Sequence, residues 1–576
     1  MSRETWFTRP IYWLLILALV LSLALAAPVG SKVSADPSEV WVDDDYCDGC
    51  YNDGHTWGYD AFARIQDGID KVKLALPATV HVAAGNYSVE TEIILFPKLQ
   101  LLGAGADVTT IDGSGSGDVV WVPSAGPDTK LDGFTITNGK RGIDLSTSSP
   151  VISNCRFVGN NSVGLHQAGG GMYNNYSSPT VTNCTFSGNS VDNSGGGMHN
   201  NYSSPAVTNC TFSDNLVSWY GGGMSNAHSS PTVTNCVFSD NRALYVGSGA
   251  GMSNDFASSP NVTNCVFWGN YAIRYGGGMY NLNNSSPTVT NCIFNGNSAE
   301  WYGGGMYSGS GSSPSVTNCV FDGNSAGWYG GGMYSQSSSS PNVKNCILVN
   351  NSAGLLQGGG LYAGASHPID YNDVWNNSGG SYGGSCSPGS NDISVDPMFF
   401  NPAAQDFHLM SGSPCIDAGT NDGAPGEDMD GNHRPIDGNG DGTATTDMGA
   451  YEYVLASVEF SATPTMGPTP LEVRFSDETP GDIDTWSWDF GDGGTSSEQN
   501  PTHVYTLPGP FTVSLIVSGP SGGGMETKVD YIWPYTQGVG GEAYPVSKLA
   551  ILAPWIALAA LLLGGTNWLV LRRRRA

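Results

Sequence analysis

The sequence predicts an all-β protein: a right-handed parallel β-helix solenoid followed by an Ig-like β-sandwich and a C-terminal transmembrane helix. Three observations predict it. A segment of about 27 residues recurs along the middle of the chain, a later stretch contains short alternating strands, and a terminal apolar run is long enough to span a bilayer. The composition agrees, because 79 glycines and only 13% charged residues favour short strands and turns over long helices.

Two markers recur with one period through eight repeats. The first is a cysteine that follows an asparagine, at Cys155, Cys184, Cys210, Cys236, Cys265, Cys292, Cys319 and Cys346. The second is a glycine-rich element that ends in methionine, at Met172, Met198, Met224, Met252, Met279, Met306 and Met333, with Leu361 closing the series. A single repeat cannot bury its own apolar face, so the repeats are expected to stack as coils of a solenoid.

Side-chain parity indicates how one coil folds. Alternate residues of a strand face the same side, so Val181, Cys184 and Phe186 all point inward only if the chain bends at Asn183. Asparagine tolerates the left-handed conformation that such a bend requires. We expect three short strands per coil, with the next corners at Asn189 and at the glycines before Met198.

The cysteines need separate interpretations. The eight repeat cysteines are interpreted as a buried stack of thiols that fills the interior, and vertical disulfides between neighbouring coils are the alternative. Cys47 and Cys50 lie among several aspartates. They are expected to form a local disulfide, and half of a metal site is the alternative.

The Phe-x-x-Asn element that follows each cysteine, as in Phe186 to Asn189, resembles the repeat of chlamydial polymorphic outer-membrane proteins. That resemblance implies a surface adhesin. The family ends in a β-barrel autotransporter, whereas this chain is predicted to end in one helix, so the family's secretion route does not carry over.

Residues 36–145 are expected to form the N-terminal cap and the first coils. The segments Phe62 to Ile69, Val80 to Tyr87, Leu101 to Gly105 and Leu131 to Ile136 resemble the N-terminal part of pectin-lyase-like β-helix proteins. Residues 62–69 are predicted to form an amphipathic capping helix, because an open solenoid end exposes unpaired strand groups. The repeat β-helix is assigned to residues 146–395.

Residues 396–455 resemble the segment that often closes such proteins, with Gly412 to Gly419 and Asp447 to Tyr453 as its marks. Within it, Asp437, Asn439 and Asp441 alternate before a glycine, like the opening of an EF-hand or dockerin calcium loop. The predicted Ca²⁺ ligands are Asp437, Asn439, Asp441 and Asp447. The family pattern places an acid where this chain has Met448, so a plain acidic turn is the alternative.

Residues 456–535 resemble a PKD domain, an Ig-like β-sandwich. The resemblance rests on Trp488 to Gly493, His503 to Tyr505 and Phe511 to Val517. Such domains act as spacers or interaction modules.

The two ends predict export and anchoring. Residues 1–35 have the order of a secretory signal, and residues 536–548 are a linker. Residues 549–571 form the predicted transmembrane helix, and the arginines of residues 572–576 are expected to be cytoplasmic. The expected location is the cell membrane, with one membrane span and an extracellular body in a prokaryotic cell envelope.

The function is expected to be adhesion, by binding of a polysaccharide or a surface protein, without catalysis. A formal net charge of −29 argues against a nucleic-acid partner. Aromatic residues before the glycines could form a binding row, and mutual stacking without a ligand is the alternative. These residues are Trp219, Tyr220, Tyr245, Tyr275, Trp301, Tyr302, Trp328 and Tyr329.

The competing function is a polysaccharide lyase or glycoside hydrolase, which would need acids and a base that converge on one face. Across the repeats, acids and bases occupy non-equivalent places, and His199 and His228 are interpreted as surface or turn residues. Apart from possible Ca²⁺, no cofactor is expected, and the chain is expected to be a monomer.

Overall fold

A computed structural model describes residues 36–537, except residues 116, 163, 165, 166, 355, 356, 482, 520 and 521. The chain divides into two compact units, Met1–Val454 and Leu455–Ala576. Among the described residues no helix is long and apolar enough to cross a membrane. The predicted signal sequence and the predicted span at 549–571 lie outside the described residues.

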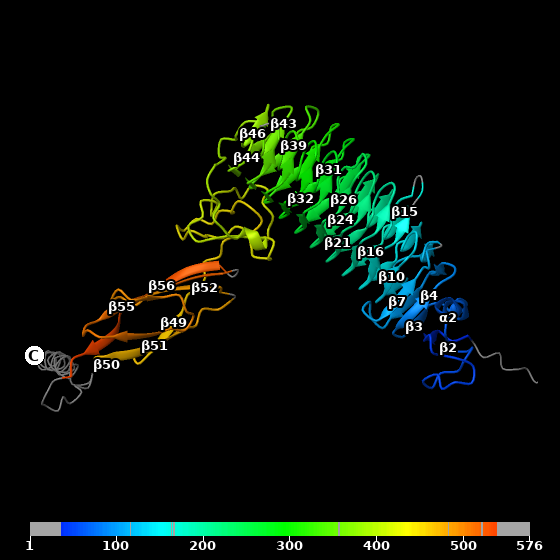
Figure 1. Cartoon of the computed structure of the whole chain (residues 1–576), viewed down its shortest axis with the longest axis horizontal. Coiled ribbons are helices and arrows are strands. Elements are labelled where there is room, and N and C mark those ends of the chain that lie inside the picture. Colours follow the sequence, from blue (N-terminus) through cyan, green and yellow to red (C-terminus); the bar gives the residue numbers. More distant parts are fainter. Residues whose placement is uncertain are drawn as a thin grey trace, which may run out of the picture. The chain divides into compact units, whose positions relative to one another are not determined.

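Each repeat forms one coil of a parallel β-helix (Figure 1). In the coil that carries Cys184, the strands are β16 (Thr180–Thr182), β17 (Thr185–Ser187), β18 (Ser190–Val191) and β19 (Met198–Asn201). Each strand pairs in parallel with its counterpart in the next coil. Four sheets therefore run along the solenoid, and we name them the Val, Phe, short and Met sheets. The short sheet is a fourth strand per coil, where the sequence predicted three.

The strands of each sheet follow in spatial order. The Val sheet contains β2 (Ala61–Phe62), β1 (Glu39–Val42), β3 (Ala78–Val82), β6 (Leu99–Gly103), β9 (Lys130–Asp132), β12 (Val151–Ser153), β16, β20 (Ala206–Thr208), β24 (Thr232–Thr234), β28 (Asn261–Thr263), β32 (Thr288–Thr290), β36 (Ser315–Thr317), β40 (Asn342–Lys344) and β44 (Ile369–Asp370). The Phe sheet contains β4 (Gly85–Ser88), β7 (Thr109–Asp112), β10 (Thr135–Thr137), β13 (Arg156–Val158), β17, β21 (Thr211–Ser213), β25 (Val237–Ser239), β29 (Val266–Trp268), β33 (Ile293–Asn295), β37 (Val320–Asp322), β41 (Ile347–Val349) and β45 (Asp373–Trp375). The short sheet contains β14 (Asn161–Ser162), β18, β22 (Leu216–Val217), β26 (Arg242–Ala243), β30 (Tyr271–Ala272), β34 (Ser298–Ala299), β38 (Ser325–Ala326) and β42 (Ser352–Ala353). The Met sheet contains β5 (Ile93–Ile94), β8 (Val120–Pro123), β11 (Ile143–Ser146), β15 (Met172–Asn175), β19, β23 (Met224–Ala227), β27 (Met252–Asp255), β31 (Met279–Asn281), β35 (Met306–Ser308), β39 (Met333–Ser335), β43 (Leu361–Ala363) and β46 (Tyr382–Gly384).

The corner between the Val and Phe sheets is the predicted one. Asn183 has a φ of 54° there, and its amide donates to the Asn154 side chain in the coil before. The next corner lies at the predicted place, between β17 and β18, but Asn189 is not the residue that makes the turn. Gly188 takes the left-handed conformation, with a φ of 62°. Asn189 instead points inward, because its side chain completes hydrogen bonds between coils.

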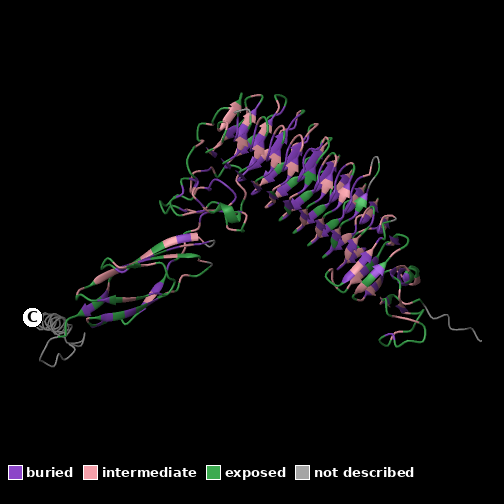
Figure 2. Cartoon of the chain, in the orientation of Figure 1, coloured by how far each residue is buried: buried purple, intermediate pink, exposed green. Residues whose placement is uncertain are grey.

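The interior is filled by identical residues stacked on one another. Figure 2 shows buried positions recurring from coil to coil along the solenoid. The Val, Cys, Phe and Met positions of the repeats are 0–3% exposed. Successive phenylalanine rings stack with centroids 4.6–4.9 Å apart. The eight repeat cysteines are buried with free thiols. Each Sγ lies against a backbone carbonyl of its own coil, such as Cys210 Sγ at 3.2 Å from Thr208 O.

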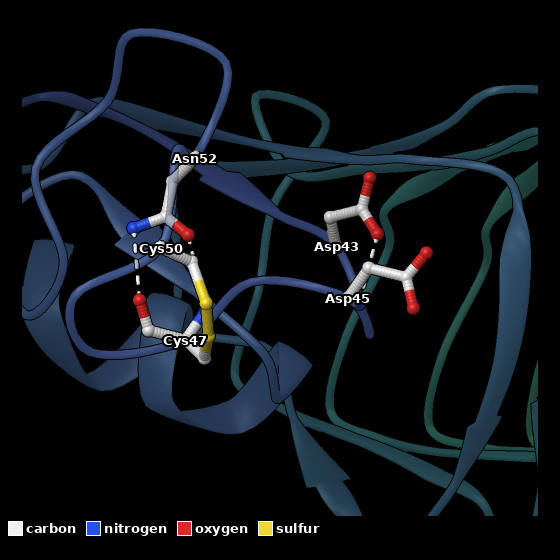
Figure 3. The surroundings of a disulfide bond; sticks show 5 residues. All are labelled: Asp43, Asp45, Cys47, Cys50 and Asn52. Atoms are coloured by element: carbon white, nitrogen blue, oxygen red, sulfur yellow. Dashed lines mark hydrogen bonds between the residues drawn. A yellow bond between two sulfur atoms is a disulfide. The ribbon is translucent and has the colours of Figure 1, made fainter.

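The N-terminal end is covered by α2 (Ile65–Val72), near the predicted capping helix. Its buried residues Ile65, Ile69 and Val72 belong to the same apolar core as Val40 and Val80. In the loop before it, Cys47 and Cys50 form a disulfide, the first of the two predicted alternatives (Figure 3). The Asn52 side chain closes this loop by donating to the carbonyl of Cys47 and accepting its N–H.

The segment after the last coil contains β47 (Phe399–Asn401), η1 (Pro402–Ala404) and β48 (Asp406–Leu409). It packs on the outer side of the Phe sheet, where Phe407 and Met448 share a buried cluster with Val320 and Ile347. The corner asparagines hold it in place: Asn318 Nδ2 donates to Asp447 O at 2.9 Å, and Asn345 Nδ2 donates to Thr420 O at 2.9 Å. This segment therefore covers the side of the last coils.

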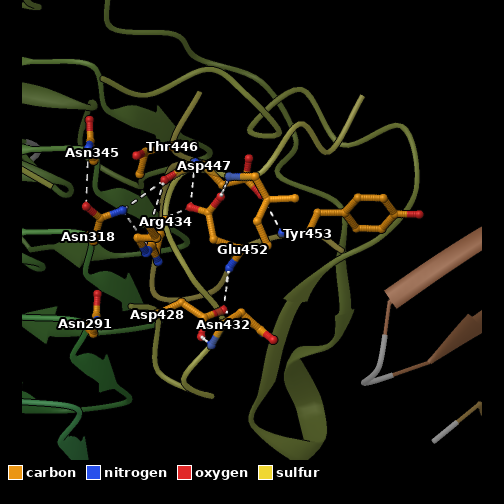
Figure 4. A network of polar contacts seen from close by, with 12 residues as sticks. Asn291, Asn318, Asn345, Asp428, Asn432, Arg434, Thr446, Asp447, Glu452 and Tyr453 are labelled. Atoms are coloured by element: carbon orange, nitrogen blue, oxygen red, sulfur yellow. Dashed lines mark hydrogen bonds and ion pairs between the residues drawn. The ribbon is translucent and has the colours of Figure 1, made fainter. Parts of the chain in front are cut away.

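The segment is organised around a buried ion pair (Figure 4). Arg434 Nη1 lies 3.0 Å from Glu452 Oε1, and neither side chain is exposed. Arg434 also donates to the carbonyls of Asp447 and Gly449. A buried charge without a partner is strongly unfavourable, so these contacts fix the path of the segment.

The second unit is a β-sandwich. One sheet contains β49 (Phe460–Thr463), β51 (Leu471–Asp477) and β54 (Thr502–Tyr505). The other contains β50 (Met466–Pro468), β56 (Gly522–Tyr535), β55 (Phe511–Gly519), β52 (Thr485–Asp489) and β53 (Thr495–Ser496). Trp488 and Tyr505 are fully buried between them, and this agrees with the predicted Ig-like fold.

Candidate functional site

The outer face of the Met sheet carries a line of aromatic, acidic, histidine and serine side chains. Because methionine points inward, the residue after it points outward. The strand register aligns these residues as one row, which we call the outer row. It consists of Trp121, Asp144, Tyr173, His199, Ser225, Ser253, Tyr280, Tyr307, Tyr334 and Tyr362.

Part of the predicted aromatic row lies beside the outer row. Bridges align Tyr220, Ser248, Tyr275, Tyr302 and Tyr329 in successive coils. The rings of Tyr275, Tyr302 and Tyr329 stack with centroids 5.6 and 5.8 Å apart. The predicted row therefore forms over the consecutive coils that repeat Tyr-Gly-Gly-Gly-Met.

The tryptophans form a further line outside these tyrosines. Trp301 and Trp328 stack with centroids 5.5 Å apart, and the Arg274 guanidinium lies 5.2 Å from the Trp301 ring centroid. Trp219 and Trp328 are 45% and 42% exposed. These exposed rings are the part of the surface that a ligand can reach.

Tyr245 does not join the row, contrary to the prediction. Ser248 occupies the register between Tyr220 and Tyr275, because this coil carries extra residues before its glycines. Tyr245 lies in that insertion and is 73% exposed. Spacing from the glycines alone could not show this shift.

The prediction missed the tyrosines of the outer row itself. Tyr280, Tyr307, Tyr334 and Tyr362 stack at 5.2–5.3 Å, and Tyr307 lies 4.7 Å from Tyr275 in the neighbouring row. Tyr280 and Tyr307 are only 4% and 2% exposed. Burial raises the pKa of Tyr334 to about 12, so its hydroxyl stays neutral. The Met-Tyr dipeptide that recurs in the repeats was the sequence signal that could have identified these tyrosines.

We call the two tyrosine rows and the tryptophan line together the aromatic surface. Most of its ring faces lie against neighbouring rings, which is the predicted alternative of mutual stacking. The tryptophans remain accessible at its edge. The surface thus offers a rigid base with a few exposed rings.

Acids and a base do converge at the N-terminal end of the same face, in the coils that precede the eight repeats. Arg141 Nη1 lies 2.6 Å from Asp144 Oδ2 and 3.4 Å from Asp118 Oδ2. The Arg141 guanidinium also lies 4.3 Å from the ring centroid of Tyr173. Burial raises the pKa of Asp144, against the opposing effect of Arg141. We call these residues, with His199, the acid–arginine cluster.

His199 stacks on Tyr173 with centroids 5.6 Å apart. Burial, followed by the nearby Arg141 charge, lowers the pKa of His199 to about 4. The ring is therefore neutral near pH 7, and its Nδ1 is buried without a hydrogen-bond partner in the described part of the chain. The interpretation of His199 as an ordinary surface histidine missed this setting.

The predicted calcium ligands fall in two places. Asp437 accepts the N–H groups of Gly440, Asp441 and Gly442, and Asn439 Oδ1 accepts that of Asp441. This is a tight acidic turn at the surface. The Asp447 carboxylate is buried and accepts N–H groups from Asp417 and Tyr453. Binding of Ca²⁺ stays a prediction.

Another acidic group lies near the disulfide. Asp43, Asp44 and Asp45 each offer a carboxylate oxygen within 4.8 Å of the others. Asp43 also accepts the N–H of Asp45, as a turn would require.

The fold agrees with known families. Residues 117–294 and 272–397 match the family described as right handed beta helix region, and residues 456–533 match the PKD domain. The predicted parallel β-helix and the predicted PKD domain are confirmed. The resemblance of residues 396–455 to a closing segment stays a prediction. The likeness of the repeat to the chlamydial outer-membrane repeat stays a prediction.

Individual relatives cover small parts of the chain or resemble it only in fold. Collagenase ColQ1 from Bacillus cereus is 49% identical over 47 residues, which are 8% of this chain and 5% of the collagenase. The PKD1 domain of Vibrio anguillarum Epp is 27% identical and covers 15% of this chain and 100% of its own, with a TM-score of 0.13. The A-module of the mannuronan C-5 epimerase AlgE4 from Azotobacter vinelandii is 16% identical and covers 58% of this chain and 92% of its own, with a TM-score of 0.35. At these values the structural likenesses say nothing of activity.

Proposed function

We propose that this protein binds a polysaccharide through the aromatic surface on the Met sheet, as a non-catalytic adhesion module. The observation that supports it is the exposed tryptophan line held on two packed rows of tyrosines. Aromatic rings with a rigid base provide large contact area at low entropic cost. Trp301 and Trp328 occupy the accessible edge of this surface.

The proposal places the body of the protein at the cell surface. It rests on residues 1–35 as an export signal and residues 549–571 as an anchor. In this arrangement the sandwich domain acts as a spacer, and the β-helix presents its aromatic surface to the polysaccharide.

Removal of the stacked pair Trp301 and Trp328 tests the binding proposal. The variant Trp301→Ala/Trp328→Ala should lose binding on a glycan array while its melting temperature stays close to that of the wild type. Trp268→Ala is the matched control, because Trp268 is 38% exposed on the Phe sheet of the same β-helix. Equal loss in the control, or unchanged binding in the double variant, would refute the proposal.

A second candidate function is hydrolysis or lyase cleavage of a polysaccharide, and the acid–arginine cluster favours it. Asp118 and Asp144 flank one arginine on the same sheet face as the aromatic surface, and a neutral His199 stacks on Tyr173, the next residue of the outer row after Asp144. Carboxyl pairs and a neutral base are the groups that such reactions use.

An assay for new reducing ends and unsaturated sugars separates the two candidates. Turnover that disappears in Asp144→Asn but persists in Asp437→Asn would establish the enzyme. Absence of products from every glycan that the wild type binds favours the adhesion module.

A further inference from the structure

A separate row of aromatic side chains follows the corner after the Met sheet, away from the tryptophan line. It consists of Tyr176, Tyr202, His228 and Phe256, one in each of four successive coils, and we call it the corner row. Their rings stack with centroids 5.0, 4.5 and 5.0 Å apart. Tyr176, Tyr202 and Phe256 are 59%, 48% and 49% exposed.

Tyr176, Tyr202 and Phe256 adopt a backbone conformation that bulky side chains avoid, and His228, of a residue type more often found there, shares it. In chain order, the four φ values are 49°, 48°, 52° and 54°. This region suits glycine and asparagine, and a bulky residue there is a true outlier. Such outliers concentrate at sites with a function, because the surrounding fold must enforce them.

The fold itself does not require aromatic residues at this corner. The equivalent positions in other coils hold Thr147 before the row and Asn283 and Ser310 after it, with φ values of 52°, 52° and 49°. Small and polar residues therefore make the same turn. The aromatic rings are a property of four coils only.

Polar groups line the corner row. Exposed serines follow it in each coil, and each hydroxyl oxygen accepts a backbone N–H from the next coil, as Ser178 and Ser204 do. Their O–H groups have no acceptor within the described chain. On the other side, Asn201 Nδ2 donates to Asn175 Oδ1.

The surface along the corner row carries little charge. Asp255 is the one formally charged residue among the corner row, its preceding residues and the serines named above. Its Oδ1 accepts N–H groups from Phe256 and Asn283. A polyanion would gain no cationic partner here, whereas hydroxyl groups of a neutral sugar would meet both donors and acceptors.

We propose that the corner row is a second binding site, for a linear uncharged polysaccharide. Ring edges line its length, because ring faces within the row cover one another. Thr147 and Asn283 continue the row without rings, so Tyr176 and Phe256, 59% and 49% exposed, end the apolar strip that a sugar can contact. The serine hydroxyls then donate to sugar oxygens along the strip.

The test replaces rings by the residue that suits the conformation. Tyr176→Asn/Tyr202→Asn/Phe256→Asn should weaken binding of uncharged hexasaccharides (cellohexaose, xylohexaose and mannohexaose) about tenfold or more, measured by calorimetry on the full chain. Its melting temperature should equal or exceed that of the wild type, because asparagine tolerates this backbone region. Tyr51→Asn is the matched control, since Tyr51 is 86% exposed outside the row.

Hydrogen exchange locates the site independently of the tryptophan line. A bound hexasaccharide should protect residues 200–206 from exchange both in the wild type and in Trp301→Ala/Trp328→Ala. Binding at the corner row can therefore be measured even if the aromatic surface binds no sugar. The proposal is overturned if none of the hexasaccharides binds, if hexagalacturonate is preferred, or if the triple variant binds like the wild type. A triple variant that melts several degrees lower with unchanged binding would assign the row a purely structural role.

Discussion

Asn241 lies at the centre of a row of inward asparagines that links the coils, and its removal tests how much that row stabilises the fold. Its Oδ1 accepts the backbone N–H of Asn215 at 3.1 Å, and its Nδ2 donates to Phe212 O at 2.9 Å. The side chain is fully buried. Asn241→Ala therefore leaves a buried N–H without an acceptor and deprives a carbonyl of its side-chain donor.

The expected loss follows mainly from the N–H of Asn215. A buried polar group left unsatisfied costs about 1–3 kcal/mol, so the variant should lose at least about that much unfolding free energy. Asn209→Gly is the control, because it removes an exposed asparagine amide at the corner between the Val and Phe sheets while keeping a residue that suits a φ of 54°. That control should lose less than about 1 kcal/mol.

Urea unfolding followed by circular dichroism measures the difference, and hydrogen exchange at Asn215 reports it locally. The Asn215 amide should exchange much faster in Asn241→Ala than in Asn209→Gly. Equal stability of the two variants, with an Asn215 amide still protected in Asn241→Ala, would refute the reasoning.

Three further predictions concern the other buried groups. Burial raises the pKa of Asp373 to about 7. The stability that its protonated form contributes is therefore complete below about pH 4 and is lost as the pH rises through about 7. Asp373→Asn should flatten the change in urea midpoint between pH 5 and pH 8.5, and an unchanged slope would contradict this. Arg434→Met leaves Glu452 buried without its partner and should lower the unfolding free energy by about 3–5 kcal/mol. The loss should appear as faster proteolysis within residues 396–454. The control Lys344→Met, at an ion pair whose aspartate is 91% exposed, should be digested like the wild type. The repeat cysteines have free thiols, so alkylation in denaturant without reductant should modify all eight, and unmodified pairs in the mass spectrum would indicate vertical disulfides.

The repeat could be read from the sequence because its signals are local and are repeated. The asparagine before each cysteine marked a corner, and the inward Val, Cys, Phe and Met followed from parity. The role of Asn189 at the next corner was not predicted, because an asparagine can either adopt the left-handed turn or bond inside the core. The glycine before it decides between these two roles, and that choice depends on hydrogen bonds to neighbouring coils.

The candidate sites were less predictable for the same reason. The row of Tyr275, Tyr302 and Tyr329 was visible in the repeat, but Tyr245 left the register through an insertion. Arg141, Asp118 and Asp144 have no shared motif, since they meet only when one coil is laid on the next.

The sequence by itself determined that this protein is a β-helix of stacked repeats followed by a β-sandwich, because each repeat carries the apolar period and the turn residues of its own coil. Only the tertiary structure decided which outward side chains share a face. That depends on the register between coils, on insertions such as the one at Tyr245, and on the backbone conformation that turns Tyr176, Tyr202, His228 and Phe256 outward. Contacts between coils bring together residues about 27 positions apart, and no local pattern records which of them will meet.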